Sequence, residues 1–346
     1  MIESVRMKGG ERMPEAQYEH EYRGVISRIG ATLLIFLGMF AVSQVIYTEM
    51  LRLIGTDDMG SYLICTVPYA ILYFASFTLP ILFFKRFSKR TGMEPMRLRP
   101  RMTADAPLLI IGAIGVILVC AVINNLLIAP LVSSKTGMED LYLPTEYNEP
   151  YQIVMQFILM ALVPGICEEL LFRSVVLSNL MPYGKTGAVI ASALLFGLMH
   201  QNPGQMFYAT MAGVILALLY IYTGSIFCCM LTHVCNNAFG VFEETLIAHL
   251  AEKDLWIVSA IESGLILLSA LSLLVALLIR RVRLIPQVDF RSGVFGKTLP
   301  DAEGYAPKPV PSQRKIRLFF APTMILFLVI TAIEMASILF VLMFGV

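Results

Sequence analysis

Hydrophobic residues occur in nine long runs that are separated by polar stretches. The runs cover about residues 27–48, 61–84, 106–132, 150–180, 187–202, 205–222, 226–245, 255–279 and 318–345. A helix needs roughly 20 mainly apolar residues to cross the hydrocarbon core of a bilayer. The pattern therefore predicts an all-α, polytopic membrane protein, a helical bundle with about nine transmembrane helices.

The four middle runs differ from the others in length and polarity. The first three and the last two runs are mainly apolar, as in ordinary lipid-facing spans, whereas the middle four are shorter or more polar, and Pro164 and Gly165 interrupt the fourth. Irregular, polar spans are tolerated at membrane depth only where protein or a water-filled cavity surrounds them. We therefore expect the middle runs to form an interior, and Pro164 and Gly165 to open the fourth helix to water.

Composition supports a membrane protein. Of the 346 residues, 57% are hydrophobic and 15% are charged, whereas a soluble globular chain carries roughly 25% charged residues. The six cysteines lie in apolar runs without the spacing of a disulfide framework or a CxxC metal site, so we expect them to be small buried side chains. The polar N-terminal segment has no apolar core, which is unlike a signal peptide.

Lysine and arginine predict the orientation. Most of the 26 basic residues lie at the N-terminus, in residues 85–101 or in residues 280–317. Nine spans place these three segments on the same side of the membrane. Because basic loops stay in the cytoplasm, we expect an integral protein of the plasma membrane with a cytoplasmic N-terminus.

Four regions follow from this pattern. We expect a cytoplasmic tail (1–26), N-terminal transmembrane helices (27–149), a catalytic helix core (150–245) and C-terminal transmembrane helices (246–346). The last region contains a basic, proline-containing cytoplasmic loop (280–317). This loop is interpreted as a solvated linker, with docking on anionic lipid headgroups as the alternative. Because the basic charge is divided among loops that flank membrane spans, we expect no nucleic-acid binding.

The middle runs contain a small set of polar residues. They include an acid pair and an arginine in the fourth run, a histidine in the fifth, and a histidine and two asparagines in the seventh: Glu168, Glu169, Arg173, His200, His233, Asn236 and Asn237. Ionisable residues inside a membrane are rare and usually face a partner or a cavity. Counted from the cytoplasmic ends of their helices, the key residues fall at roughly 12–20 Å depth, at 1.5 Å per residue. We therefore expect them to converge.

Spacing separates the two glutamates. Glu169 and Arg173 are four residues apart on one helix face, so they can neutralise each other. Glu168 points about 100° away and has no local partner. His233 and Asn237 are also four residues apart, so both can point toward one place.

These spacings predict a site formed by Glu168, His200, His233 and Asn237. An acid in an apolar pocket holds its proton more firmly, which suits a general acid or base near neutral pH. The same groups suit binding or activating a water. Alternatively, Glu168, His200 and His233 hold zinc or another divalent metal.

Each residue also has a structural interpretation. An intramembrane histidine often packs and hydrogen-bonds, an asparagine often joins two helices, and a Glu–Arg pair can be purely structural. The alignment of several such residues at one depth favours a site. Glu262 and Glu334 are also predicted to lie within spans, and the sequence assigns them no role.

Three motifs in this region resemble those of a known family. EELLFR (168–173) matches EExxxR, FGLMH (196–200) matches FxxxH, and HVCNN (233–237) matches HxxxN. In this order they resemble the motifs of the type II CAAX prenyl endopeptidase family, also called the CPBP or Abi intramembrane proteases. The resemblance covers about residues 150–245.

The resemblance implies a membrane peptidase with a water-filled cavity that opens to the cytosol. Glu168 would activate the hydrolytic water. The other three site residues would orient the water, stabilise the oxyanion or bind a metal. Structural support of the site would come from Glu169, Arg173 and Phe196. A metalloendopeptidase with zinc or another divalent metal and a metal-free, glutamate-dependent enzyme both remain open.

The implied partners are the lipid bilayer and a membrane-bound protein or peptide, either a CAAX-type prenylated protein or a bacteriocin or peptide precursor. Two other functions compete with proteolysis. One is a non-catalytic scaffold or immunity protein that keeps the polar core. The other is an ion-coupled transporter, in which paired inverted repeats with broken helices are expected. The polar cluster occurs once, in the middle of the chain, which disfavours the transporter.

Overall fold

The computed structural model describes residues 15–56, 58–90, 106–128, 130, 149–280, 288–289, 294–295, 316–317 and 319–344. Nearly all of these residues are helical, which confirms the all-α prediction. The start of the expected N-terminal tail (1–14) and most of the 280–317 loop lie outside the described residues.

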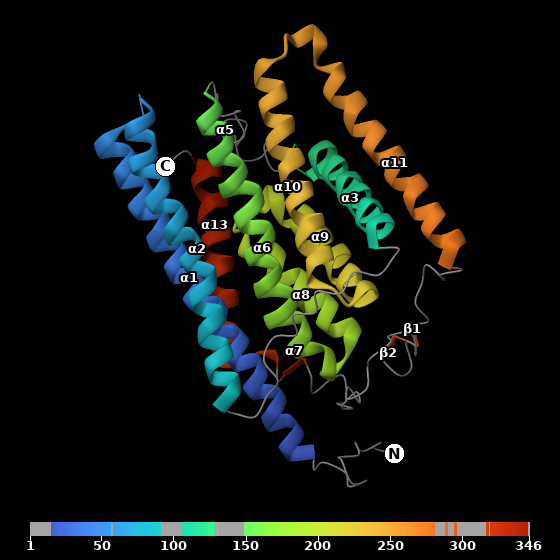
Figure 1. Cartoon of the computed structure of the whole chain (residues 1–346). Coiled ribbons are helices and arrows are strands. Elements are labelled where there is room, and N and C mark those ends of the chain that lie inside the picture. Colours follow the sequence, from blue (N-terminus) through green and yellow to red (C-terminus); the bar gives the residue numbers. More distant parts are fainter. Residues whose placement is uncertain are drawn as a thin grey trace.

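Helices α1 (Glu15–Ile54) and α2 (Met59–Arg90) form a long antiparallel pair (Figure 1). Helix α13 (Pro322–Phe344) packs along α1. A Cβ atom at Gly30 would lie 2.6 Å from the backbone nitrogen of Met324. Glycine is therefore needed for the close approach of α1 and α13, as is common between membrane helices.

The fourth hydrophobic run forms one continuous helix from Pro150 to Tyr183. Its backbone hydrogen bonding alternates between α-helical and π-helical. The α-helical segments are α5 (Pro150–Gln156), α6 (Val163–Glu169) and α7 (Ser178–Leu180). The π-helical segments between them are η3 (Phe157–Leu162) and η4 (Leu170–Leu177), and the 3₁₀ turn η5 (Met181–Tyr183) ends the helix. The expectation that Pro164 and Gly165 interrupt this helix was therefore wrong.

The π-helical stretches explain how the helix passes through a proline. Pro164 has no N–H with which to continue the α-helical ladder. In η3 the bonding is already shifted by one residue, since the N–H of Val163 donates to the carbonyl of Ile158. Such local π adjustments satisfy backbone groups that a proline leaves unpaired in a membrane helix.

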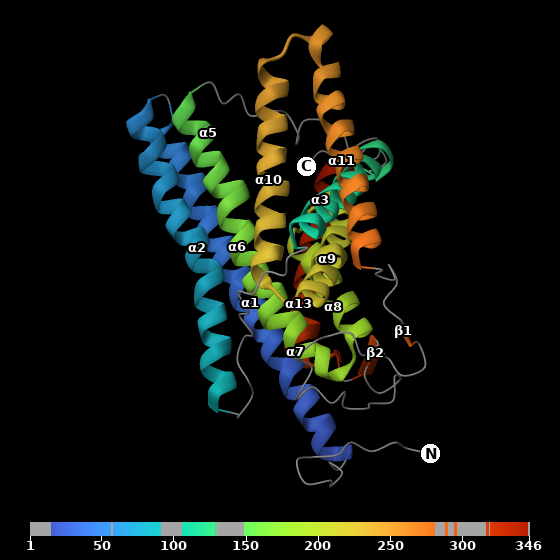
Figure 2. The same cartoon turned by 45° about the vertical axis from the view of Figure 1, so that its right-hand side comes forward.

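Three further helices complete the core: α8 (Lys185–Met199), α9 (Pro203–Thr223) and α10 (Ile226–His249). Gln201, at φ 54°, turns the chain sharply between α8 and α9, and the Asn202 side chain then caps α9 by accepting the N–H of Gly204 at 2.9 Å. Gly224, at φ 64°, makes the turn between α9 and α10. These short connections place α9 next to both α8 and α10 (Figure 2).

Helix α3 (Ala106–Ile123), continued by η1 (Asn124–Ile128), pairs with α11 (Trp256–Arg280) on the outside of the core. The short helix η6 (Glu252–Asp254) connects α10 to α11. Strand β1 (Val288–Asp289) pairs antiparallel with β2 (Val294–Phe295) beyond α11. The cysteines are free, and all are buried except Cys235, which corrects the prediction for that one residue.

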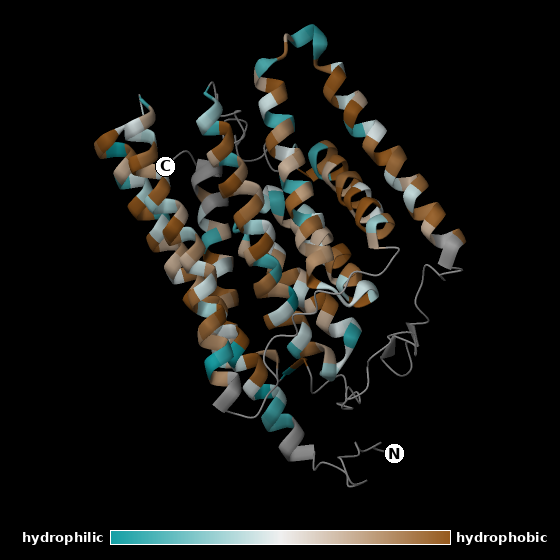
Figure 3. Cartoon of the chain, in the orientation of Figure 1, coloured by the Kyte–Doolittle hydropathy of each residue, from teal (hydrophilic) through white to brown (hydrophobic). Residues whose placement is uncertain are grey.

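Helices occur at all nine predicted positions of the described chain. Within the residues that the structure describes, six helical stretches are long and apolar enough to cross a bilayer. Helix α8, with 15 residues, spans only about 22 Å, and α10 carries many polar residues (Figure 3). Leu267 and Leu278 on α11 are 70% and 71% exposed, as expected of side chains that face lipid. The chain is an integral membrane protein.

Candidate active site

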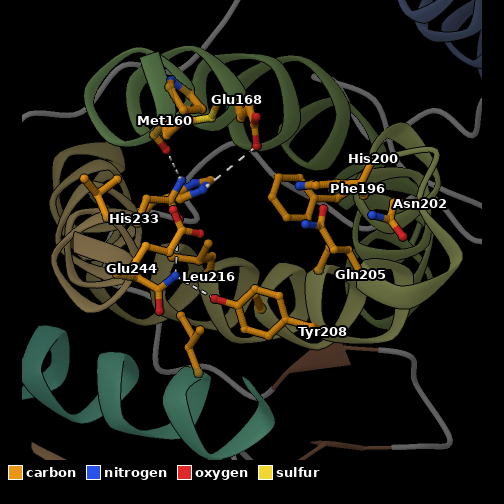
Figure 4. Close-up of a pocket in the computed structure, with 18 of the residues that line it drawn as sticks. Met160, Glu168, Phe196, His200, Asn202, Gln205, Tyr208, Leu216, His233 and Glu244 are labelled. Atoms are coloured by element: carbon orange, nitrogen blue, oxygen red, sulfur yellow. Dashed lines mark hydrogen bonds and ion pairs between the residues drawn. The ribbon is translucent and has the colours of Figure 1, made fainter. Parts of the chain in front are cut away.

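A cavity of 680 Å³ lies among α6, α8, α9 and α10 (Figure 4). The four residues predicted to share a site all line it: Glu168, His200, His233 and Asn237. Three separate helices contribute them, so the convergence comes from the tertiary fold. The central geometric expectation of the sequence is met.

Gly165 brings two of these helices together. A Cβ atom at this position would lie 2.6 Å from Cγ2 of Val234 and 2.8 Å from its backbone nitrogen. Helices α6 and α10 can therefore touch through their backbones only because residue 165 is glycine. The contact places His233, the neighbour of Val234, beside the two glutamates.

Glu169 and Arg173 form the expected ion pair. The Nε atom of Arg173 lies 2.9 Å from Oε2 of Glu169, and both side chains are completely buried. The guanidinium also lies over the ring of Phe196, 5.2 Å from its centroid. Glu169 has a further contact that the sequence did not indicate: its Oε1 accepts the Nδ1–H of His233 at 2.9 Å. Arg173, Glu169 and His233 thus form one buried chain of charges and hydrogen bonds.

Glu168 faces the cavity from α6 (Figure 4). Its Oε2 atom lies 3.9 Å from Nε2 of His233, beyond hydrogen-bond distance. This oxygen is buried and has no hydrogen-bond partner among the described residues. The sequence-based division of the two glutamates is correct in its geometry, since Glu169 is paired and Glu168 keeps an available acceptor.

His200 lies at the end of α8, next to the sharp turn at Gln201. Its Nδ1–H donates to the carbonyl of Phe196 at 2.8 Å, so the Nε2 atom carries the free lone pair. The amide of Gln201 donates to Oε2 of Glu334 on α13. Glu334, which the sequence left without a role, therefore holds the turn that carries His200.

Phe196 lies between the two histidines. Its ring centroid is 5.0 Å from that of His200 and 5.8 Å from that of His233. With Arg173 against its face, Phe196 fills the space between the ion pair and the cavity. This position is consistent with the predicted supporting role.

Asn237 lines the cavity but points to a different partner than expected. Its Nδ2 donates to the carbonyl of Met160 at 3.0 Å. Met160 is four residues before Pro164, and proline cannot supply the usual α-helical donor to that carbonyl. One function of Asn237 is therefore to satisfy η3 across the helix interface.

A metal at Glu168, His200 and His233 was the open alternative. Both histidines donate Nδ1–H to an oxygen and leave Nε2 as an acceptor, which is the arrangement that metal-binding histidines use. However, no three His, Cys, Asp or Glu side chains of the described chain are grouped closely enough to hold a metal ion. As placed, the side chains do not form a metal-binding group.

Several polar residues of the cavity were missed by the sequence reasoning. Gln156, Gln205 and Tyr208 line it, and the Nδ2 of Asn236 donates to the Tyr208 hydroxyl at 2.7 Å. Tyr73 of α2 also reaches the cavity wall. Only Asn236 had a sequence signal, because it lies inside a membrane helix next to Asn237.

Comparison with protein families gives a match at residues 150–239, to the family described as Type II CAAX prenyl endopeptidase Rce1-like. The matched segment runs from α5 into α10 and contains Glu168, His200, His233 and Asn237. Comparisons with curated proteins and with solved structures gave no match. The resemblance expected from the three motifs is thereby confirmed. The segment that builds the cavity is similar to the Rce1-like type II CAAX prenyl endopeptidases, a family of proteases, and it lies within an integral membrane protein.

Proposed function

We propose that this protein is an intramembrane endopeptidase in which Glu168 activates the hydrolytic water. The supporting observation is the buried Oε2 of Glu168, which faces a polar cavity without a hydrogen-bond partner among the described residues. A buried acceptor of this kind is costly unless something occupies it. A bound water would satisfy the oxygen and is also the second substrate of peptide hydrolysis.

The gap between Glu168 and His233 suits such a water. Two polar atoms 3.9 Å apart are too far apart for a direct hydrogen bond and close enough for one water to bridge. The water would donate one hydrogen to Oε2 of Glu168 and the other to Nε2 of His233. Because Glu169 accepts the Nδ1–H of His233, the ring is held with Nε2 as the acceptor.

The reaction follows from this arrangement. Glu168 takes a proton from the water as the water oxygen attacks the carbonyl carbon of the peptide bond. The tetrahedral intermediate then collapses, the C–N bond breaks, and Glu168 returns the proton to the leaving nitrogen. His200, whose Nε2 is also an acceptor, and Asn237 orient the water and the peptide. No step of this reaction is assigned to a metal.

The proposed substrate is a membrane-associated protein or peptide, either a CAAX-type prenylated protein or a bacteriocin or peptide precursor. The family match supports a protease with a membrane-bound substrate. We propose a plasma-membrane location with the N-terminus in the cytoplasm, because the basic segments follow that orientation. In agreement, α1 begins and α2 ends at the same end of the bundle (Figures 1 and 2).

Substitution Glu168→Gln tests the proposal. In proteoliposomes that contain a membrane-tethered peptide, we expect cleavage to fall by roughly 10²–10⁴-fold, as for loss of a general base. The protein should insert and melt as the wild type does. Glu262→Gln on α11 is the matched control, since Glu262 does not line the cavity. If Glu168→Gln cleaves at the wild-type rate, hydrolysis proceeds by other chemistry. If the wild type itself does not cleave the peptide, the protein is a non-catalytic scaffold.

The role of metal needs a separate measurement. Elemental analysis of the purified protein, together with cleavage rates before and after chelator treatment, distinguishes a metal-dependent route from a glutamate-dependent one. Both histidines present Nε2 lone pairs, so either result is compatible with Glu168 being essential.

A further inference from the structure

The wall of the cavity opposite Glu168 carries a fixed hydroxyl group. Tyr208 lies on α9, across the cavity from Glu168 (Figure 4). Asn236 on α10 donates Nδ2–H to the Tyr208 oxygen at 2.7 Å and to Oδ1 of Asn237 at 3.2 Å. The phenol oxygen thus acts as an acceptor toward Asn236, and its own proton is left to point elsewhere.

No described residue accepts the Tyr208 proton, since the one hydrogen bond of this hydroxyl within the described part of the chain is the one it receives. The two histidines that line the cavity use their ring N–H groups elsewhere. His200 and His233 use their Nδ1–H on Phe196 and Glu169, and their Nε2 atoms are acceptors. These two rings therefore provide no hydrogen-bond donor to the cavity.

Peptide hydrolysis needs a donor in this cavity. When water attacks a carbonyl, negative charge develops on the carbonyl oxygen, and donors fixed in advance toward that oxygen stabilise the transition state. Asn237 already donates Nδ2 to Met160. Tyr208 is therefore the best-placed donor, with a proton that no described residue accepts.

Two further features distinguish Tyr208 from the cavity glutamines, Gln156 and Gln205. Its hydroxyl is fixed by Asn236, which is 8% exposed, whereas no residue in the described part of the chain is hydrogen-bonded to the side-chain amide of Gln205. Donation from the amide also polarises the phenol, which makes its O–H a stronger donor. A preorganised donor of this kind costs little reorganisation during the reaction.

We propose that Tyr208 is a catalytic residue whose hydroxyl donates to the carbonyl oxygen of the scissile peptide bond and stabilises the oxyanion, and that Asn236 is its positioning residue. This inference rests on the proposed function. The water held by Glu168 attacks from one wall of the cavity, and Tyr208 receives the developing charge from the opposite wall.

Substitution Tyr208→Phe removes only the hydroxyl. In the proteoliposome assay we expect kcat to fall roughly 10²-fold, the lower end of the effect of losing one oxyanion donor, with KM within about twofold of wild type. Tyr222→Phe is the matched control: it makes the same change on the same helix, at a hydroxyl that does not line the cavity. We expect it to leave kcat unchanged.

Asn236→Asp tests the positioning role. An aspartate accepts the Tyr208 proton instead of donating to its oxygen, so the O–H turns away from the cavity. We expect kcat to fall nearly as far as in Tyr208→Phe, with little further loss in the double variant. Independent losses that multiply in the double variant would show that Asn236 does not act through Tyr208.

A binding measurement separates this inference from the proposed function. A peptide with a phosphonate at the scissile bond mimics the oxyanion, and an N-methylated peptide of the same sequence does not. Tyr208→Phe should weaken phosphonate binding at least tenfold relative to the N-methylated peptide. If Glu168→Gln abolishes cleavage but Tyr208→Phe keeps wild-type kcat and phosphonate affinity, the Tyr208 assignment alone is wrong. If Glu168→Gln and wild type behave alike, the proposed function fails, and the Tyr208 assignment fails with it.

Discussion

The α6–α10 and α3–α11 interfaces both rely on glycines that let two helices come close. At α6–α10, Gly165 faces Val234 of α10. At α3–α11, Gly112 and Gly115 face Leu273 and Ser269 of α11, where added Cβ atoms would lie 2.3 Å and 2.0 Å from side-chain carbons. The two interfaces differ in what they enclose.

The α6–α10 interface buries Glu169 beside Arg173 of η4, and it places His233 against Glu169 at the edge of the cavity. Among the described residues of the α3–α11 interface, the polar contact is a hydroxyl hydrogen bond, which Ser272 donates to the carbonyl of Leu108 at 2.9 Å. Close packing alone is therefore common to both and does not indicate a site. The buried charges distinguish the interface that borders the cavity. Burying a charge costs desolvation free energy, and two helices can pack closely without any buried charge.

The largest expected effect is on stability, from Arg173→Met. This change leaves Glu169 buried without its cation, which typically costs about 3–5 kcal/mol. Unfolding in mild detergent, followed by loss of helical circular dichroism, measures the effect. Arg52→Met is the matched control, because the Arg52–Glu49 pair is 67% and 52% exposed and such pairs contribute about 0–1 kcal/mol. Equal losses in the two variants would contradict the view that burial sets the cost.

An intermediate effect is expected from Gly165→Ala. The new methyl group overlaps Val234, so α10 must shift, at a cost of about 1–3 kcal/mol for overpacking, and His233 moves away from Glu168. We expect lower stability together with a lower cleavage rate per folded molecule.

Gly115→Ala tests whether overpacking at a different interface has the same effect, since its added methyl group overlaps Ser269 between α3 and α11. It should lower stability but leave the cleavage rate of the folded protein unchanged. Gly264→Ala, where no atom lies within 4 Å of the added methyl, should change neither. If Gly115→Ala slows cleavage as much as Gly165→Ala, the two interfaces do not have separate roles.

The smallest expected effect comes from Glu334→Ala. Removing the acceptor of the Gln201 amide loosens the turn that carries His200. We expect kcat to fall roughly fivefold, about what the loss of one hydrogen bond worth 1 kcal/mol allows, with an unchanged melting temperature. Glu262→Ala, a glutamate of another helix, serves as the control. An unchanged kcat in Glu334→Ala would show that the turn holds His200 without α13.

Residue spacing predicted the features whose geometry lies within one helix. Glu169 and Arg173 form their pair because residues four apart share a helix face. The depth of Glu168, His200 and His233 could be counted because each residue adds a fixed rise. The expectation of a helix break failed at Pro164, because π-helical segments carry the helix through the proline without interrupting it.

The sequence by itself determined the helical spans, the Glu169–Arg173 pair and the similar positions of Glu168, His200, His233 and Asn237 along their helices. These follow from hydrophobic run length and from the fixed period and rise of a helix. Only the tertiary structure decided that His233 bonds to Glu169, that Asn237 reaches Met160 and that Tyr208 and Glu334 belong to the site. Those contacts depend on how each helix is rotated about its axis and how closely it approaches its neighbours, and residue spacing along one helix contains neither quantity.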